Sequence, residues 1–418
     1  MYRTARGTSD ILPEEQGYWR LVEKAVTDTA GLYGYQRIDT PVFEDTSLFR
    51  RSAGEYTDVV QKEMYTFDDK GGNSLTLKPE GTPAVCRAYI QHGMHNLSQP
   101  VKLYYVSPIF RYDRPQAGRY RQHHQFGCEA IGEADPALDS EIIDTAWGLY
   151  RSLGLTQISL QMNSIGCKKC RPDYIGALKK HYTGYAGGLC ADCQVRLEEN
   201  PMRLLDCKQA SCQAAADSAP MSADYLCDEC SEHFTSLQKY LGLMKIPFEL
   251  NHRMVRGFDY YTRTVFEIVP AGGGSQSSLG GGGRYDDLIA ELGGKPTPAI
   301  GFATGIERII LNLKEQITAV PAMAGIRVLV AHLGGEAKDI SVEIAARLRQ
   351  AGVSAITATG SKSLKAQMRQ ANNLGARYTV IIGDEEVSNS TVVLRDMANA
   401  QQQTIAAGDL AGILKQRD

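Results

Sequence analysis

FRYDRPQAGRYRQHHQFGCE, residues 110–129, is the stretch that decides the fold. It overlaps two short segments rich in β-branched and aromatic residues, which predict strands over Leu103–Tyr112 and His124–Ile131. Pro115 and Gly118 lie between them, so Arg114–Arg121 is predicted to be a loop joining antiparallel neighbours. The stretch therefore predicts a β-hairpin within an antiparallel sheet.

The predicted hairpin is rich in positive charge, with four arginines and one aspartate from Arg111 to His124. Side chains two residues apart share one face of a strand, so Arg111, Gln125 and Glu129 are expected to line one floor. Guanidinium groups match the oxygens of phosphate. The side chains expected to project from the loop are Arg114, Gln116, Arg119 and Arg121. Taken alone, the run would equally suit a solvated basic turn.

The neighbouring segments extend this picture to an α+β unit. Apolar residues at helical spacing predict a long helix over Glu14–Tyr33, followed by a strand over Arg37–Phe43. A helix is predicted over Pro136–Leu153 and a strand over Gln157–Met162. A second β region is predicted from these segments: Asn251–Val269, the glycine-rich run Gly272–Gly283, and Pro298–Gly305, which enters a helix at Ile306.

The pattern of predicted secondary structure changes after residues 320–325, where strands and helices begin to alternate. This alternation predicts a separate α/β domain over 326–418, with residues 1–320 as the first domain. The segments that carry the prediction are Arg327–Ala331, Lys338–Gln350, Ser354–Ala358, Leu364–Leu374 and Tyr378–Ile382.

Composition excludes several classes of protein. The 418 residues carry 45 Lys+Arg against 48 Asp+Glu, a net charge of −3, so indiscriminate polyanion binding is excluded and any nucleic-acid site must be local. No stretch approaches 18 uninterrupted apolar residues, and the N-terminus lacks a signal-peptide pattern. We therefore expect a folded cytoplasmic protein with no membrane partner.

Eight of the ten cysteines lie between Cys167 and Cys230, within a predicted insertion over residues 166–233. In a reducing compartment this spacing favours a metal or free thiols over disulfides. One candidate zinc site is Cys167, Cys170, Cys190 and Cys193, and another is Cys207, Cys212, Cys227 and Cys230. The sequence does not distinguish these tetrads from interleaved ones, or zinc from reduced structural thiols.

The hairpin resembles motif 2 of the class II aminoacyl-tRNA synthetases, in which the first Arg holds the α-phosphate of ATP. Residues 301–308, GFATGIER, resemble motif 3, whose Arg holds the γ-phosphate. The long first helix and the segment Thr40–Glu44, TPVFE, resemble motif 1 at the dimer interface. The resemblance implies an antiparallel catalytic sheet with flanking helices and a homodimer.

Within that class, four segments resemble the histidyl-tRNA synthetase family: RGTSDILP at 6–13, LKPEGTP at 77–83, VRGFDYYT at 255–262 and GGRYD at 282–286. The resemblance spans the whole chain and implies ligation of L-histidine to the 3′ end of its tRNA through a histidyl-adenylate, with release of AMP and pyrophosphate. ATP with Mg²⁺ is implied, as is an anticodon-binding role for the C-terminal domain. The family pattern usually has Arg at position 78 and often Gly at position 287, where this chain has Lys78 and Asp287.

The resemblance also implies roles for residues. Arg256 and Arg111 would stabilise the α-phosphate, and the residues implied to bind ATP are Arg111, Arg121 and Arg308. Those implied to bind histidine are Glu80, Gly81, Thr82, Gln125, Glu129, Tyr260 and Tyr261, with Glu129 and Tyr261 on the imidazole. The family's tRNA carries an extra 5′ guanosine contacted by the motif 2 loop, which assigns Arg114 and Gln116 to the acceptor end. The alternative is a non-catalytic, synthetase-like regulatory subunit of histidine biosynthesis.

Overall fold

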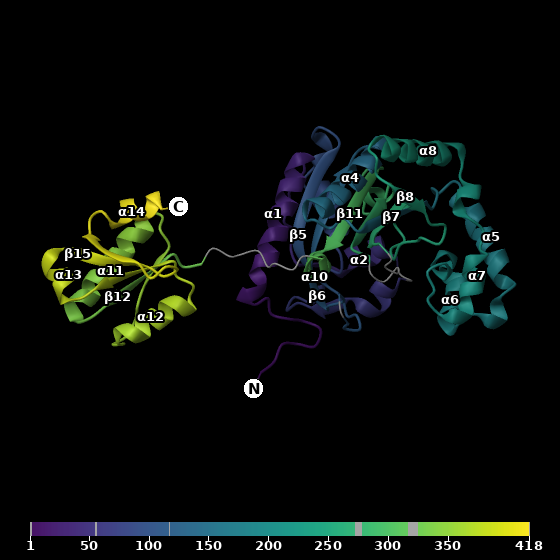
Figure 1. The fold of residues 1–418 in the computed structure, drawn as a ribbon. Coiled ribbons are helices and arrows are strands. Elements are labelled where there is room, and N and C mark those ends of the chain that lie inside the picture. The colour runs from purple at the N-terminus through teal and green to yellow at the C-terminus, as the bar shows by residue number, and fades with distance from the viewer. Residues whose placement is uncertain (1, 55–56, 117, 272–277, 317–324, 418) are drawn as a thin grey trace. The chain divides into compact units, whose positions relative to one another are not determined.

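The computed structural model describes residues 2–54, 57–116, 118–271, 278–316 and 325–417. They form two compact units that divide after Pro321 (Figure 1). The predicted boundary residues 320–324 and the first part of the glycine-rich run, 272–277, lie outside the described residues. Within the described ranges, no helix is both long enough and apolar enough to span a membrane.

The first unit is built on an eight-stranded sheet in the order β1-β5-β6-β11-β10-β9-β7-β8. The six strands from β5 to β7 pair antiparallel, whereas β1 and β8 pair parallel at the two edges. The predicted antiparallel core and its hairpin are confirmed. The strands are β1 Gln36–Arg37, β5 Val101–Phe110, β6 Gln122–Ile131, β7 Ile158–Ser164, β8 Phe248–Leu250, β9 Thr262–Pro270, β10 Gly280–Arg284 and β11 Ala299–Gly305.

One face of this sheet is covered by helices α1 (Gln16–Leu32), α4 (Pro136–Ser152), α8 (Asp228–Leu243) and α10 (Ile306–Gln316) (Figure 1). Alternate strand residues such as Phe126, Phe266 and Phe302 pack into the main apolar core there. Since successive side chains of a strand point to opposite faces, Gln125 and Glu267 lie on the other face. The alternation thus separates a packing face from a polar one.

Strand β10 lies between β9 and β11 and begins with four glycines, Gly280–Gly283. A Cβ at Gly282 would lie 2.0 Å from the carbonyl oxygen of Gly301, and one at Gly283 would lie 2.4 Å from that of Thr264. Only glycine permits this approach of three backbones.

Two predicted strands are wrong in their extent. Residues 37–43 do not form one strand: β1 ends at Arg37, and β2 (Phe43–Asp45) begins after Pro41 in a separate three-stranded sheet with β4 (Ser74–Leu77) and β3 (Tyr65–Asp68). Residues 251–261 are turns rather than strand, because the Asn251 side chain accepts a hydrogen bond from the Arg253 N–H and starts a turn. Helices α2 (Thr46–Ala53), α3 (Thr82–Gln91) and α9 (Leu288–Glu291) complete this region.

The predicted insertion follows β7 and is helical, with α5 (Arg171–Thr183), α6 (Ala191–Glu199) and α7 (Ala210–Asp217) before α8. Its helices form a lobe, the teal part of Figure 1. The lobe has its own small core, which includes Tyr174, Leu178, Leu204 and the side chains of Cys193 and Cys212.

The second unit has a five-stranded sheet in the order β13-β12-β14-β15-β16. Strands β13 (Ala355–Thr357), β12 (Val328–His332) and β14 (Tyr378–Ile382) are parallel, as the alternating pattern predicted, and α11 (Gly335–Gln350) and α12 (Leu364–Asn373) connect them. The sequence analysis did not identify the antiparallel strands β15 (Thr391–Asp396) and β16 (Gln402–Ala406), or the helices α13 (Asp384–Asn389) and α14 (Leu410–Gln416).

Candidate active site

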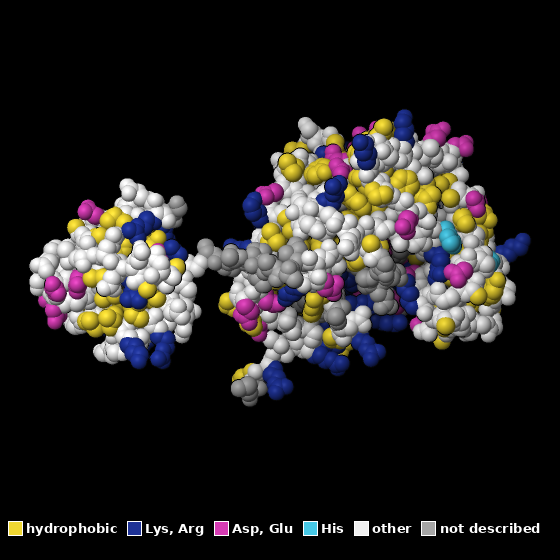
Figure 2. Space-filling model, in the orientation of Figure 1, with side chains coloured by type: hydrophobic (Ala, Val, Ile, Leu, Met, Phe, Trp, Pro, Cys, Tyr) yellow, Lys and Arg dark blue, Asp and Glu magenta, His cyan; other side chains and the backbone are white. Residues whose placement is uncertain are grey.

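A cavity of about 760 Å³ opens on the polar face of the large sheet. One side, here called the sheet wall, includes Arg111, Gln125, Arg256, Glu267 and Arg308. The opposite side, here called the insertion wall, consists of Arg203, Leu205, Asp206, Lys208 and Gln213 from the lobe. In Figure 2 a hollow separates the lobe from the rest of the unit, and dark-blue Lys and Arg side chains gather in it.

Three arginines converge in the cavity from motifs 2 and 3. Arg111 follows β5 and donates from Nε to the Pro79 carbonyl at 2.7 Å. Arg308, in the first turn of α10, donates to the carbonyls of Gly118 at 3.0 Å and Ser278 at 2.6 Å. Burial lowers the pKa of Arg308, and the nearby Arg119 and Arg111 lower it further. Backbone contacts thus fix like charges close together, an arrangement that a polyanion would stabilise.

Arg256 lies in the loop before β9 and also lines the cavity. Its Nη1 donates to Glu267 Oε1 at 2.5 Å, and its guanidinium lies 5.7 Å from the Tyr261 ring centre. Its Nε has no hydrogen-bond partner among the described residues. The side chain is therefore oriented while it keeps a donor for a ligand.

Acceptors gather beside these cations. Glu80 and Gln125 line the cavity, and each has one buried oxygen, Oε1, with no hydrogen-bond partner in the described part of the chain. The other Glu80 oxygen accepts from the Tyr260 hydroxyl at 2.6 Å. Burial raises the pKa of Glu80 to about 7. Unpaired buried acceptors are costly, so the site suits a ligand with a charged amino group.

Glu129 is buried, and it is not among the side chains that line the cavity. Its carboxylate accepts from the hydroxyls of Thr82 at 2.6 Å and Tyr285 at 2.5 Å. Burial raises its pKa to about 8. A Cβ at Gly301, its partner across β11, would lie 1.9 Å from Oε2, so that glycine makes room for the carboxylate. Because Thr82 does line the cavity, Glu129 lies directly behind the wall.

The remaining residues implied to bind histidine are close together. Gly81 lines the cavity, and its missing side chain leaves room for the Tyr105 ring, which a Cβ would approach to 2.2 Å. Tyr260 and Tyr261 also line it, are almost fully buried, and have ring centres 4.6 Å apart. Six of the seven residues implied to bind histidine therefore line one cavity, and the seventh, Glu129, lies behind Thr82.

The loop of the hairpin divides into two parts. Arg119 lines the cavity, although the sequence analysis gave it no specific role. Arg121, implied to bind ATP, does not line it, because its guanidinium stacks on the Tyr112 ring at 3.7 Å. Arg114 and Gln116 are exposed and lie outside the cavity lining.

Sequence reasoning also missed Glu267 and the insertion wall. The period of two along β9, which places Val265 and Glu267 on the face of Gln125, was the available signal for Glu267. No comparable signal exists for the insertion wall, because its residues reach the cavity through the tertiary packing of the lobe. The unusual Lys78 is buried away from the cavity and donates to Thr40 Oγ1 at 3.1 Å. Asp287 also lies outside the lining and pairs with Lys168.

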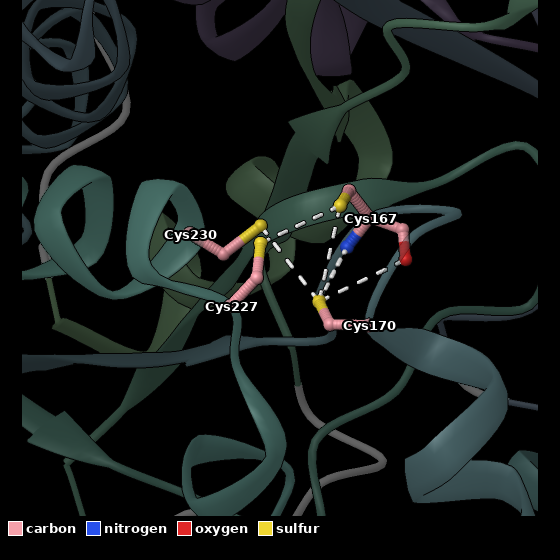
Figure 3. Close-up of side chains that lie close together, drawn as sticks. All are labelled: Cys167, Cys170, Cys227 and Cys230. Atoms are coloured by element: carbon pink, nitrogen blue, oxygen red, sulfur yellow. Dashed lines mark hydrogen bonds between the residues drawn. The ribbon is translucent and has the colours of Figure 1, made fainter.

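The cysteines form two tetrads, and the pairing is nested rather than consecutive. In one, here called the closing tetrad, Cys167, Cys170, Cys227 and Cys230 point toward one another (Figure 3). The second, here called the lobe tetrad, consists of Cys190, Cys193, Cys207 and Cys212. In each tetrad all four sulfurs lie within 4.8 Å of one another. The consecutive grouping is therefore wrong, and the nested grouping, one of those that the spacing left open, holds.

An antiparallel sheet flanked by helices, a basic motif 2 hairpin and an arginine at the start of the motif 3 helix define the catalytic fold of the class II aminoacyl-tRNA synthetases. The family model described as histidyl-tRNA synthetase matches residues 7–169 and 194–309, and one described as an anticodon binding domain matches residues 327–417. The chain belongs to the histidyl-tRNA synthetase family.

Individual relatives agree. The chain is 57% identical to a histidine–tRNA ligase of Dehalococcoides mccartyi and 49% identical to one of Desulforudis audaxviator, with at least 97% of each chain covered. Among solved structures it is similar to the apo histidyl-tRNA synthetase of S. aureus, at 37% identity and a TM-score of 0.83 over 99% of both chains. A Bacillus halodurans protein titled as an ATP phosphoribosyltransferase regulatory subunit/histidyl-tRNA synthetase has 20% identity and a TM-score of 0.64, over 92% of this chain and 98% of its own, and shares the fold.

Proposed function

We propose that this protein is a histidine–tRNA ligase that joins L-histidine to the 3′ end of its tRNA. The observation that carries the proposal is the single cavity in which Arg111, Arg119 and Arg308 converge beside the unpaired acceptors of Glu80 and Gln125. A triphosphate suits the cations, and an amino acid suits the acceptors. A non-catalytic regulatory subunit would need neither the complete set of arginines nor the complete set of acceptors.

In the first step, the histidine carboxylate attacks the α-phosphorus of ATP and pyrophosphate leaves, which gives histidyl-adenylate. Negative charge develops on the phosphate oxygens, and Arg111 and Arg256 supply oriented donors for it. Arg308, with Arg119, is assigned to the terminal phosphates. Mg²⁺ would accompany ATP and offset the charge of its phosphates, and the lining carboxylates of Glu267 and Glu307 would offer the oxygen ligands that it prefers.

Histidine is proposed to bind at the other end of the cavity. Glu80, Gln125 and Thr82 offer three oxygens to the three N–H groups of its α-ammonium, with Tyr260 positioning Glu80 and Gly81 leaving space. Tyr261 and Glu129 are assigned to the imidazole, which has one donor and one acceptor when neutral. Since Glu129 lies behind Thr82, this assignment needs a small rearrangement of the wall on binding.

The second step transfers the histidyl group to the 3′ end of the tRNA and releases AMP. The exposed Arg114 and Gln116 are assigned to the acceptor end of the tRNA, outside the ATP site. We expect Arg114→Ala to lower tRNA charging more than pyrophosphate exchange. The reverse ranking would move Arg114 into the ATP site.

The first domain is proposed to be catalytic and the second to bind the anticodon. A chain that ends at Pro321 is expected to form histidyl-adenylate but to lose most tRNA charging, because the motifs for activation all precede residue 309. Undiminished charging by this fragment would contradict the anticodon role. We also propose a cytoplasmic location, where tRNA and ATP are both abundant.

A homodimer is proposed through the motif 1 region. Val42 and Phe43, beside Pro41, are 39% and 45% exposed, and the Phe43 ring packs against Phe67, itself 43% exposed. Adjacent exposed apolar side chains favour an interface. Sedimentation should show a dimer, which Phe43→Asp should weaken, and a monomeric wild-type chain would contradict the proposal.

Pyrophosphate exchange that depends on histidine and ATP tests the central proposal. Exchange with histidine, and none with other amino acids, is the expected result. Absence of exchange from a folded protein that still binds ATP would instead support the regulatory alternative.

A further inference from the structure

We propose that the eight cysteines of the insertion bind two zinc ions, and that the closing tetrad, by fixing Arg171 against Tyr261, supports the histidine end of the cavity. The metal sites stand on their own, whereas the effect on histidine rests on the proposed function.

The geometry of the sulfurs fits zinc. Four thiolates in a tetrahedron at about 2.3 Å from Zn²⁺ lie about 3.8 Å from one another. The sulfur–sulfur distances are 3.8 Å for Cys167–Cys170, 3.9 Å for Cys167–Cys227 and 3.9 Å for Cys170–Cys230, and 3.8 Å for Cys190–Cys207 in the lobe tetrad. A disulfide needs about 2.05 Å.

Backbone hydrogen bonds to the sulfurs also favour metal binding. The N–H of Cys167 donates to the sulfur of Cys170 at 3.3 Å, and that of Cys190 donates to the sulfur of Cys212 at 3.3 Å. Such donors stabilise thiolates, the form that binds metal. Four sulfur ligands in a closed tetrahedron favour zinc in a structural role.

The two sites have different positions in the fold. The closing tetrad joins the start of the insertion, after β7, to its end at the first turn of α8, so it clasps both ends of the lobe (Figure 3). The lobe tetrad includes Cys207, which lies between Asp206 and Lys208 on the insertion wall. The closing tetrad thus joins the two ends of the lobe, and the lobe tetrad supports the insertion wall.

Arg171 connects the closing tetrad to the active site. It directly follows Cys170, and its N–H donates to the Cys167 carbonyl at 2.9 Å. Its Nη2 donates to the Tyr261 carbonyl at 2.6 Å and to that of Gly166 at 3.0 Å. Burial lowers its pKa. Tyr261 lines the cavity, so Arg171 is a positioning residue that acts through the tyrosine backbone.

Elemental analysis of the full-length chain, purified from zinc-supplemented medium, tests the sites. The expected content is two zinc ions per chain, with one left in Cys190→Ser/Cys193→Ser and one left in Cys227→Ser/Cys230→Ser. Where a variant does not fold, mercurial titration of the wild-type thiols should release both ions. A metal-free chain whose insertion resists proteolysis would overturn the proposal, and bound iron would overturn the choice of zinc.

The positioning role is tested by Arg171→Ala, which keeps all eight ligands. We expect two zinc ions, a rise of about tenfold in the histidine KM of the exchange reaction, and little change in kcat or in the KM for ATP. Lys169→Ala, whose exposed side chain is on the other side of Cys170, is the matched control. An unchanged histidine KM, with zinc retained, would overturn the positioning role and leave the metal sites and the proposed function unaffected.

Discussion

The two walls of the cavity are both basic, but one lies on the large sheet and the other on the insertion, and they differ in exposure. On the sheet wall, Arg111, just after β5, and Arg308, at the start of α10, donate to backbone carbonyls, and strand residues of the sheet such as Phe126 and Val265 are fully buried. On the insertion wall, Arg203 likewise donates to a backbone carbonyl, that of Arg256 at 3.3 Å, whereas Lys208 pairs with Asp206 at 2.7 Å and is 46% exposed. We therefore expect the sheet wall to carry the activation step and the exposed lysine of the insertion wall to contact the tRNA.

The largest effect should come from the sheet wall. Arg256→Ala is expected to reduce histidine-dependent pyrophosphate exchange by about 10²- to 10³-fold, because one oriented group at the site of developing charge is lost. Arg114→Ala, on the exposed part of the hairpin loop, is the control and should stay within a few-fold in this assay. If Arg256→Ala exchanged pyrophosphate at nearly the wild-type rate, the role assigned to Arg256 at the α-phosphate would be wrong.

A residue behind the sheet wall should show an intermediate effect confined to one ligand. Glu129→Gln is expected to raise the KM for histidine by about 10- to 100-fold, since it replaces the carboxyl group assigned to the imidazole, while the KM for ATP stays nearly constant. Measuring both constants in the exchange reaction checks this. Equal losses for the two ligands would argue that Glu129 supports the whole wall rather than the imidazole.

A substitution on the insertion wall should affect tRNA charging more than pyrophosphate exchange. Lys208→Ala is expected to weaken tRNA charging by about three- to tenfold and to reduce the slope of log KM for tRNA against log salt by about one, as for the loss of one phosphate contact. Exchange should be unaffected. Lys179→Ala, on the same lobe but outside the cavity lining, provides the control. A larger effect on exchange than on charging would contradict the assignment of the insertion wall to tRNA binding.

A further prediction concerns the dependence of stability on pH. Burial raises the pKa of Glu129 to about 8, so between about pH 5 and 8 the folded state holds a proton that the unfolded state has released. The free energy of unfolding should therefore fall as pH rises through this window, by at most about 1.4 kcal/mol per pH unit from this group. Urea unfolding of the wild type and Glu129→Gln should give a shallower slope for the variant. Identical slopes would show that Glu129 does not carry this proton.

Much of the sheet wall was predictable because local signals and geometry agree there. Short β-branched segments around Pro115 and Gly118 identified the hairpin, and strand alternation correctly placed Gln125 and Glu129 on one face. The alternation could not show that Glu129 is capped by Thr82, since that contact joins residues 47 positions apart.

The rest depended on packing that spacing does not encode. Consecutive Cys-x2-Cys pairs gave no indication that Cys167 would meet Cys227, 60 positions away, because that meeting requires the lobe to fold back on β7. Likewise, the sequence does not show which of the two loop arginines, Arg119 or Arg121, lines the cavity. The stacking of Arg121 on Tyr112 is what takes it away from the cavity.

The glycine strand β10 also has a consequence for heredity. Every single-nucleotide change in a glycine codon that alters the residue introduces a Cβ or a stop, and Gly282 and Gly283 have no space for one. No conservative missense change is therefore available at these two positions. A saturation library of the gene should recover only synonymous codons there, even under selection that tolerates a weakly active enzyme.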